Sequence, residues 1–187
     1  MKNFNKLLAV FMGLFVIYYS FIGNNFLYNY FLIILIIPFI FKIPPYHTLI
    51  FLVMMFLLLF LGGQQGLHLY TTTSWYDKFA HFLFGIFGSI PALWVLMKFK
   101  ILKNSLWCSC IFIFCFGLTL GIFWEIFEFT VDTFLNTDMQ RRATGVTDTM
   151  MDIIVCSIGH IVFILWYIFE VKMKKNGLIT RLIEEMK

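Results

Sequence analysis

Long runs of apolar residues alternate with short polar segments along the whole chain. At about 1.5 Å per helical residue, each run can cross most or all of a hydrocarbon core about 30 Å thick. The pattern therefore predicts an all-α, polytopic bundle of about six transmembrane helices. Their expected bounds are Leu7–Ile22, Phe26–Phe41, Thr48–Leu69, Asp77–Met97, Leu106–Thr133 and Thr147–Val171.

All 187 residues are expected to form one integral membrane domain. Residues 1–45 are predicted to be an N-terminal helical hairpin, whose second helix ends at Pro44 and Pro45 because proline does not continue a helix. Residues 48–171 form a four-helix part that carries the polar motifs, and residues 172–187 form a cytoplasmic tail. Apolar residues of the tail recur at helical spacing, which predicts either an interfacial helix or a plain solvated tail.

Composition sets the class of protein. Of all residues, 61% are hydrophobic and only 13% are charged, whereas soluble domains have about 25% charged residues. The mean hydropathy of +0.88 likewise requires lipid as the solvent. A soluble globular protein is therefore excluded. The net charge of +4 reflects the topology described next rather than a basic patch, so no nucleic-acid partner is expected.

The basic residues indicate how the chain is oriented in the membrane. With six spans and both termini in the cytoplasm, eleven of the 14 lysines and arginines lie inside, as the positive-inside rule requires. Only Lys78, Arg141 and Arg142 then lie outside. We therefore expect both termini on the cytoplasmic side and the loop around Arg141 on the external side.

The acidic residues gather at the opposite end of the predicted bundle. Seven of the ten carboxylates fall in its outer half or outer loops, namely Asp77, Glu125, Glu128, Asp132, Asp138, Asp148 and Asp152. An ionisable group inside a membrane costs several kcal/mol, so the default interpretation is an interior, functional position. The outer end is therefore the first place to look for a site.

Spacing places the residues of the fifth predicted helix on one face. Gly117 and Gly121 share this face with Glu125, Glu128 and Asp132, because each step along the set is three or four residues. The two glycines allow another helix to approach closely. The three carboxylates are expected to point at that same neighbour.

The fourth and sixth predicted helices repeat this design. Each has acidic or histidine residues followed by glycine at helical spacing, namely Asp77, His81, Gly85 and Gly88 in the fourth and Asp148, Asp152 and Gly159 in the sixth. Both contain D-x-x-x-[H/D]-x6-G, which suggests that helices 3–4 and 5–6 are a duplicated hairpin with a site between the repeats. The third helix would then contribute Gln64, Gln65 and His68 near its outer end.

Capping offers a structural explanation for two of the aspartates. Ser74 three residues before Asp77 resembles a helix N-cap pair, and Thr147 with Asp148 could cap the sixth helix, where a carboxylate also suits the helix dipole. His160 lies deeper and 120° away from the acidic face of its helix. We expect His160 to have a packing or hydrogen-bonding role.

Salt bridges are the structural explanation for the two glutamates. Glu125 and Glu128 lie near a helix C-terminus, where the dipole disfavours a carboxylate, and Arg141 and Arg142 lie on the short connecting loop. However, the six carboxylates other than Asp138 outnumber the three basic residues at this end, to which His81 could add one positive charge. A dry cluster therefore needs protons or a bound cation. Oxygen ligands with one imidazole suit Mg²⁺, Mn²⁺, Ca²⁺ or, less well, Zn²⁺.

These residues define a candidate site at the outer end of the fourth, fifth and sixth helices. The expected ligands of a divalent cation such as Mg²⁺ or Mn²⁺ are Glu125, Glu128, Asp148 and Asp152. His81, oriented by Asp77 one turn away or by a neighbouring carboxylate, is the candidate catalytic acid or base. Arg141 and Arg142, with Gln140, are the candidates for binding a phosphate or carboxylate group of a substrate.

Three motifs carry a resemblance to a known family. They are W-Y-D-K-F-A-H-F-x-x-G at Trp75–Gly85, W-E-I-F-E-F-x-x-D at Trp124–Asp132 and T-G-V-x-D-T-M-x-D-I-I-V-x-x-I-G at Thr144–Gly159. Together with Met139 and Gln140 they resemble the YjdF-type family of uncharacterised bacterial inner-membrane proteins. More distantly, D-K-x-x-H-F and the D-x-x-x-D helix are similar to VanZ-like proteins, named for an accessory factor in teicoplanin resistance. The resemblance covers roughly residues 70–165 and implies a bacterial plasma-membrane protein linked to envelope chemistry, with no catalytic assignment.

Three hypotheses of function follow, and the sequence leaves open whether the protein is an enzyme. The first is an outward-facing site that binds, and could process, an amphiphilic envelope molecule such as a lipid-linked glycan, a phospholipid or a cell-wall precursor. The second is a small ion-coupled transporter whose carboxylates relay protons or bind the driven ion, although no cytoplasmic counterpart completes a path. The third is a non-catalytic accessory protein in which the charges only hold helices together. Membrane lipid is the partner that all three share.

Overall fold

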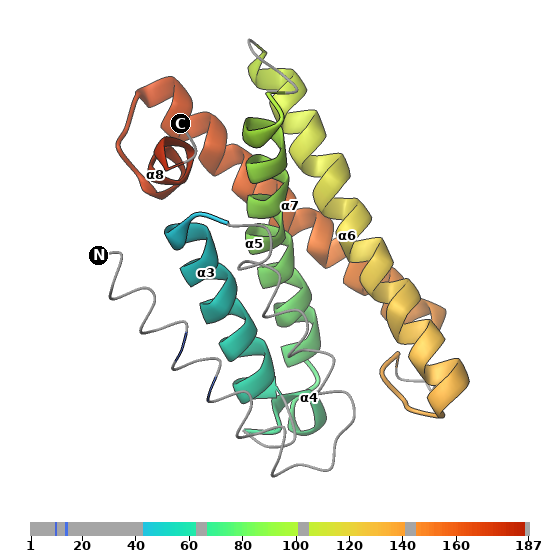
Figure 1. Ribbon diagram of the computed structural model, residues 1–187. Helices are drawn as coiled ribbons and strands as arrows, with labels where there is room; N and C mark the ends of the chain where they lie inside the picture. The colour runs from blue at the N-terminus through green and yellow to red at the C-terminus, as the bar shows by residue number, and fades with distance from the viewer. Residues whose placement is uncertain are drawn as a thin grey trace. The chain divides into compact units, whose positions relative to one another are not determined.

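The computed structural model describes Val10, Leu14 and residues 43–62, 67–100, 105–140 and 145–185. Within these ranges all regular structure is helical and no strand is present, which confirms the all-α prediction (Figure 1). Apart from Val10 and Leu14, the first two predicted spans lie outside the described residues, and so do Gln64 and Gln65. The chain forms two compact units, Met1–Ser74 and Trp75–Lys187, each of which is described by itself.

The first unit corrects the bounds of the third predicted span. Helix α3 runs over Pro45–Phe56, with proline in its first turn, where the missing N–H is not needed. The π-helix η1 (Leu57–Gly62) follows. Leu69, predicted to end the span, instead begins the four-residue helix α4 (Leu69–Thr72). The residue before it, His68, has a left-handed backbone conformation with φ 56°. Glycines at positions 62, 63 and 66 interrupt the apolar run, and glycine is a poor helix former.

The second unit contains three long apolar helices. They are α5 (Tyr76–Lys98), α6 (Leu106–Leu135) and α7 (Val146–Met173). Their mean hydropathies of 1.8, 2.2 and 2.1 make them the three candidate membrane spans within the described part of the chain. Each begins and ends within two residues of the fourth, fifth and sixth predicted spans. The apolar runs therefore located these helices correctly.

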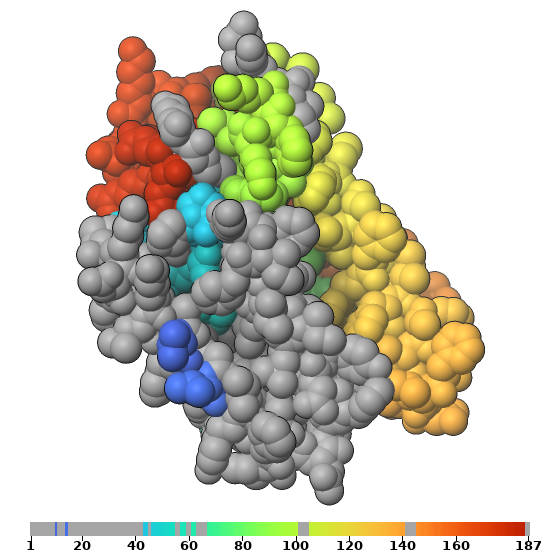
Figure 2. Space-filling view, viewed as in Figure 1, coloured from blue at the N-terminus to red at the C-terminus, as the bar shows by residue number. Residues whose placement is uncertain are grey.

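The outer surface of α6 is apolar and aromatic. Trp107, Phe123 and Phe129 are all at least 60% exposed, and Figure 2 shows the side chains of α6, yellow to orange, on one side of the molecule. A water-soluble protein rarely exposes such a continuous apolar surface. A lipid environment accounts for it, because hydrocarbon solvates these rings as well as a protein core does.

Glycines bring α5 and α7 into backbone contact. A Cβ atom added to Gly85 would overlap the carbonyl oxygen of Cys156 and lie 2.9 Å from the Cα of Gly159. A Cβ atom added to Gly159 would in turn overlap the carbonyl oxygen of Phe82. The two glycines therefore mark the point where these helices cross, as small residues do in membrane helix pairs.

The glycine face of α6 receives side chains of α7, as its spacing predicted. A Cβ atom on Gly117 would meet the imidazole ring of His160, and one on Gly121 would lie 3.0 Å from the Sγ atom of Cys156. All three long helices contact one another. Since α6 runs antiparallel to α5 and α7, the start of α5, the end of α6 and the start of α7 share one end of the bundle, which we call the acidic end (Figure 1).

The tail after α7 folds back onto the bundle at the other end. Helix α8 (Leu178–Glu184) contacts α5 and α7 and has two fully buried residues, Ile179 and Leu182. The buried carboxylate of Glu170 in α7 accepts hydrogen bonds from the backbone N–H and the hydroxyl of Thr180, at 2.9 and 3.0 Å. The prediction of a helix in the tail is confirmed, and the alternative of a plain solvated tail is wrong.

Candidate functional site

Seven ionisable side chains converge at the acidic end of the bundle. The cluster consists of Asp77, Lys78 and His81 from α5, Glu125 and Glu128 from α6, and Asp148 and Asp152 from α7. The carboxylates and the histidine are all less than 10% exposed. Antiparallel packing thus brings together charged faces that are up to 75 positions apart in the chain. We call this group the acidic cluster.

Lys78 is the centre of the ion pairs in this cluster. Its Nζ atom lies 2.6 Å from Asp148, 2.8 Å from Asp152 and 3.3 Å from Asp77. The three N–H bonds of an ammonium group can serve three carboxylates in this way. Its side chain is 25% exposed, so the aliphatic part extends along the helix end while the charge reaches inward.

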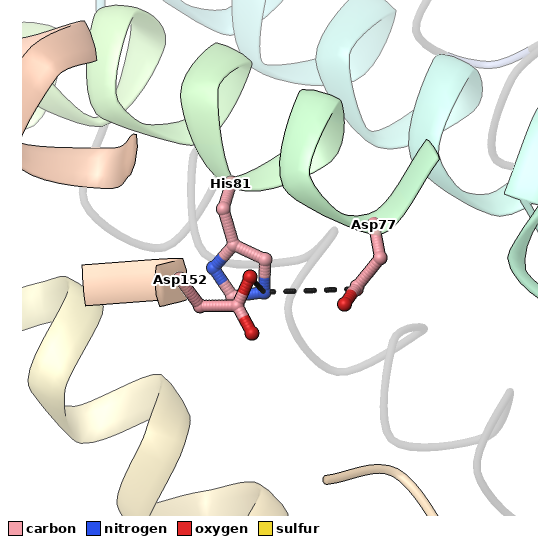
Figure 3. A group of neighbouring side chains, drawn as sticks. All are labelled: Asp77, His81 and Asp152. Carbon is pink, nitrogen blue, oxygen red and sulfur yellow. Dashed lines mark ion pairs between the residues drawn. The ribbon is translucent and has the colours of Figure 1, made fainter. Parts of the chain in front are cut away.

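His81 lies one turn deeper and faces a carboxylate from each of the three helices. Its Nε2 atom is 3.8 Å from Asp77 and 3.8 Å from Asp152, and its Nδ1 atom is 3.7 Å from Glu125. Figure 3 shows one nitrogen of the imidazole ring facing both aspartates, with a dashed line to each. Potential ligand atoms of Asp77, His81 and Asp152 all lie within 4.8 Å of one another, so these three residues could hold a metal ion.

Glu125 is buried without a hydrogen bond to either of its carboxylate oxygens within the described residues. It is 5% exposed and lines a small crevice together with His81, Asp152 and Cys156. Burying a carboxylate without donors is costly. Such a group marks a position where a donor, a proton or a cation is needed.

Two of the four expected metal ligands have other partners. Glu128 accepts a hydrogen bond of 2.7 Å from the indole N–H of Trp124, one turn earlier on α6. Asp148 forms the shortest of the ion pairs with Lys78. Of the four residues expected to bind the cation, only Asp152 belongs to the group whose ligand atoms converge in the described part of the chain.

The loop after α6 is organised by Asp132. Its carboxylate accepts hydrogen bonds from the backbone N–H groups of Met139 and Gln140, at 2.8 and 2.9 Å, and from the hydroxyl of Thr137. Gln140 in turn donates its side-chain amide to the carbonyl oxygen of Glu125 and to the Thr149 hydroxyl, at 3.3 and 3.1 Å. Gln140 thus fastens the loop to both helices, while Arg141 and Arg142 lie outside the described residues.

The capping explanation for the two aspartates is wrong. The N-cap of α5 is Trp75 and that of α7 is Gly145, and neither helix start has a side-chain cap hydrogen bond. Asp77 and Asp148 lie inside the first turn, where the helix dipole favours a carboxylate. Both direct an oxygen at Lys78 instead. Their positions depend on the contact between α5 and α7 rather than on local sequence.

A second polar group lies deeper between the helices. Nδ1 of the fully buried His160 is 2.8 Å from the Ser89 hydroxyl, and its Nε2 atom is 3.5 Å from the Cys156 thiol. The Ser89 hydroxyl also donates to the carbonyl oxygen of Gly85. The expectation that His160 is hydrogen-bonded is confirmed.

Lys78 is the cluster residue that sequence reasoning missed. The sequence counted it only as one of three external basic residues, because it lies about 100° from the face shared by Asp77 and His81. A lysine side chain is long enough to reach across that angle. One feature of the sequence could have identified Lys78. It directly follows Asp77 at the start of a predicted helix, and the neighbouring predicted helices carry carboxylates at the same end.

The charge balance limits what the cluster can do. Asp77, Glu125, Glu128, Asp148 and Asp152 face one ammonium group and one imidazole within the described residues. Buried charges of one sign are held only with protons or with counter-ions. The arrangement is therefore suited to binding a proton or a small cation.

Comparison with known proteins also indicates a membrane protein. A family described as "Predicted membrane protein (DUF2238)" matches residues 4–172. No curated protein and no solved structure matches the chain. The match covers the first two candidate spans, the third up to its penultimate residue, and every residue of the acidic cluster. The chain therefore belongs to the DUF2238 family of predicted membrane proteins.

Proposed function

We propose that this protein binds an amphiphilic molecule of the bacterial cell envelope at its acidic end, and that a divalent cation such as Mn²⁺ or Mg²⁺ takes part. The observation that carries the proposal is the excess of buried carboxylates over basic side chains in the acidic cluster. A cation relieves this excess and leaves coordination positions for an anionic head group. The exposed apolar surfaces of the helices suit the acyl or prenyl chain of such a molecule.

The roles of individual residues follow from this proposal. His81 can act as acid or base, because Asp77, one turn earlier on α5, holds a carboxylate beside it. Arg141 and Arg142 stay candidates for contacting a phosphate group, since guanidinium groups bind phosphate in a bidentate manner. Gln140 is expected to hold their loop close to the cluster, because its own amide already bonds to both helices.

We expect the acidic end to face outside, with six spans and both termini in the cytoplasm. The distribution of lysine and arginine supports this orientation. Two exposed asparagines test it, because Asn136 follows α6 and Asn176 follows α7 at opposite ends of the bundle. With the four native cysteines replaced by alanine, an impermeant thiol reagent should label Asn136→Cys in intact cells and spare Asn176→Cys. Labelling of Asn176→Cys but not of Asn136→Cys would show that the protein has the opposite orientation in the membrane.

Cation-dependent retention of an anionic amphiphile is the direct test of the proposed function. The full chain, purified in detergent, is incubated with a polyprenyl phosphate or with the matching polyprenol and analysed by native mass spectrometry. With Mn²⁺ present, retention of the phosphate should exceed that of the alcohol at least tenfold, about 1.4 kcal/mol. A chelator should abolish the difference. Equal retention of the two lipids, or retention that ignores the chelator, contradicts the proposal.

One observation favours a small ion-coupled transporter as the second candidate. The Ser89, Cys156 and His160 group continues the polar residues from the acidic cluster toward the middle of the bundle. Buried polar residues that follow one another in this way are typical of proton relays. Proteoliposomes containing a pH indicator distinguish the two functions, because a transporter produces ion flux without added amphiphile and a binding protein does not.

A further inference from the structure

We infer that Asp77, His81 and Asp152 form a three-ligand site for a transition-metal dication such as Mn²⁺ or Zn²⁺, and that Glu125 positions the histidine. The inference rests on the proposed function, in that it specifies the ligands and the class of the cation proposed there. It also changes the roles given above, since Glu125 becomes the partner of a ligand rather than a ligand, and His81 becomes a ligand rather than the acid or base.

The spacing of the three side chains suits a single ion. Nε2 of His81 lies 3.8 Å from Oδ1 of Asp77 and 3.8 Å from Oδ1 of Asp152. Metal–ligand bonds of about 2.0–2.2 Å allow neighbouring ligand atoms to lie about 3 to 4.4 Å apart. Both distances from His81 fall within this range, and the ligand atoms of the two aspartates lie within 4.8 Å of each other. The ring in Figure 3 presents this nitrogen to the two carboxylates.

Lys78 holds one of the aspartates in a ligating orientation. It bonds to Oδ2 of Asp77, which leaves Oδ1 of the same carboxylate directed at His81. The ammonium group also contacts Asp148 and both oxygens of Asp152, at 2.8 Å each, so its position is determined from both α5 and α7. Hydrogen bonds of this kind commonly orient the carboxylates that bind metals.

Glu125 provides the second, independent observation. Among the described residues no hydrogen bond is formed to either oxygen of this nearly fully buried carboxylate, and its Oε1 atom lies 3.7 Å from Nδ1 of His81. A histidine that binds a metal through one nitrogen almost always donates its other N–H to a carboxylate, a carbonyl or water. Metal binding at Nε2 leaves the proton on Nδ1, which then points at Glu125. A metal at this site thus places an N–H donor of His81 in front of this buried carboxylate.

The donor set selects the class of metal. Magnesium and calcium prefer ligand sets made of oxygen alone, whereas imidazole suits zinc, iron, nickel and copper. Manganese accepts carboxylates and imidazole together. Two carboxylates with one imidazole therefore favour Mn²⁺ or Zn²⁺ over Mg²⁺ and Ca²⁺. Three protein ligands leave further positions open for water or for an anionic head group.

Binding of Mn²⁺ alone, without lipid, tests the site. We would titrate the purified full chain with Mn²⁺ and follow the bound ion by electron paramagnetic resonance. One ion per chain should bind, and a hundredfold excess of Mg²⁺ should not displace it. Asp77→Asn and His81→Ala should each weaken binding at least tenfold. Displacement by Mg²⁺, or unchanged binding in both variants, would overturn the inference.

Two substitutions of Glu125 test its positioning role. Glu125→Ala removes the acceptor for Nδ1–H and should weaken Mn²⁺ binding about 10- to 100-fold. Glu125→Gln keeps an acceptor oxygen and should restore most of the affinity and the spectrum of the bound ion. Glu128→Gln is the matched control one turn away and should bind like the wild type. If glutamine is as harmful as alanine, or alanine is harmless, the positioning role is wrong.

Failure of this inference and failure of the proposed function give different results. A chain that binds Mn²⁺ as described but retains polyprenyl phosphate no better than polyprenol supports the metal site and refutes the proposed function. A chain that retains the phosphate in a Mg²⁺-dependent way, with no preference for Mn²⁺, supports the function and refutes the ligand assignment. Should Glu125→Ala fail to fold, Asp77→Asn at the more exposed rim still tests the ligands.

Discussion

Gly85→Ala is expected to prevent α5 and α7 from packing. The added methyl group would overlap the carbonyl oxygen of Cys156 and lie 2.9 Å from the Cα atom of Gly159, and both are backbone atoms that cannot rotate away. The helices must therefore separate along their whole crossing. This should cost more than the roughly 1–3 kcal/mol of ordinary overpacking in a core. Size-exclusion chromatography in detergent and thermal melting should show little folded protein.

Gly88→Ala is the matched control on the same helix. Its added methyl group would meet only the ring of Phe84, at 3.4 Å, and this side chain belongs to α5 itself and can move. We expect the melting temperature of Gly88→Ala to stay close to that of the wild type. Gly159→Ala, on the other side of the crossing, should behave like Gly85→Ala. A Gly85→Ala protein that melts like the wild type would refute the backbone contact.

Asp152→Asn is expected to abolish cation and amphiphile binding while the protein still folds. The residue faces His81 as well as Lys78, so its neutralisation removes a proposed ligand. Mn²⁺ affinity should fall at least 100-fold, about 2.7 kcal/mol. Stability should change little, because Lys78 keeps Asp148 at 2.6 Å and Asp77 at 3.3 Å. Melting in detergent and Mn²⁺ titration measure the two effects separately.

Asp148→Asn is the control for this substitution. It breaks the shortest ion pair of Lys78 but removes no proposed ligand, so it should lower stability at least as much as Asp152→Asn and retain Mn²⁺ binding. If the cluster only holds the helices together, both variants should lose on the order of 3–5 kcal/mol and be depleted from the membrane. Equal losses of stability in the two variants, with no difference in Mn²⁺ binding, would favour the accessory hypothesis.

The helices and their shared faces could be predicted from the sequence because both depend on local rules. The length of an apolar run sets a span, and the bounds of α5, α6 and α7 agree with the predicted ones within two residues. The helical repeat of 3.6 residues placed Gly117, Gly121 and Glu125 on one buried face of α6. The predicted span at positions 48–69 was wrong in its bounds, because the described helices are Pro45–Phe56, Leu57–Gly62 and Leu69–Thr72 rather than one continuous helix.

Partner choice within the acidic cluster required the tertiary structure. The spacing of residues along one helix determines which of them share a face. It does not determine how far a neighbouring helix is shifted along its axis or rotated about it. The backbone contact of Gly85 with Gly159 sets that shift, and it directs Asp148 and Asp152 at Lys78. The packing of α6 against this pair adds Glu125, so that His81 faces carboxylates of all three helices. Sequence alone therefore determined that acidic groups meet at one end of a membrane bundle, and only packing decided which of them face the lysine and which face the histidine.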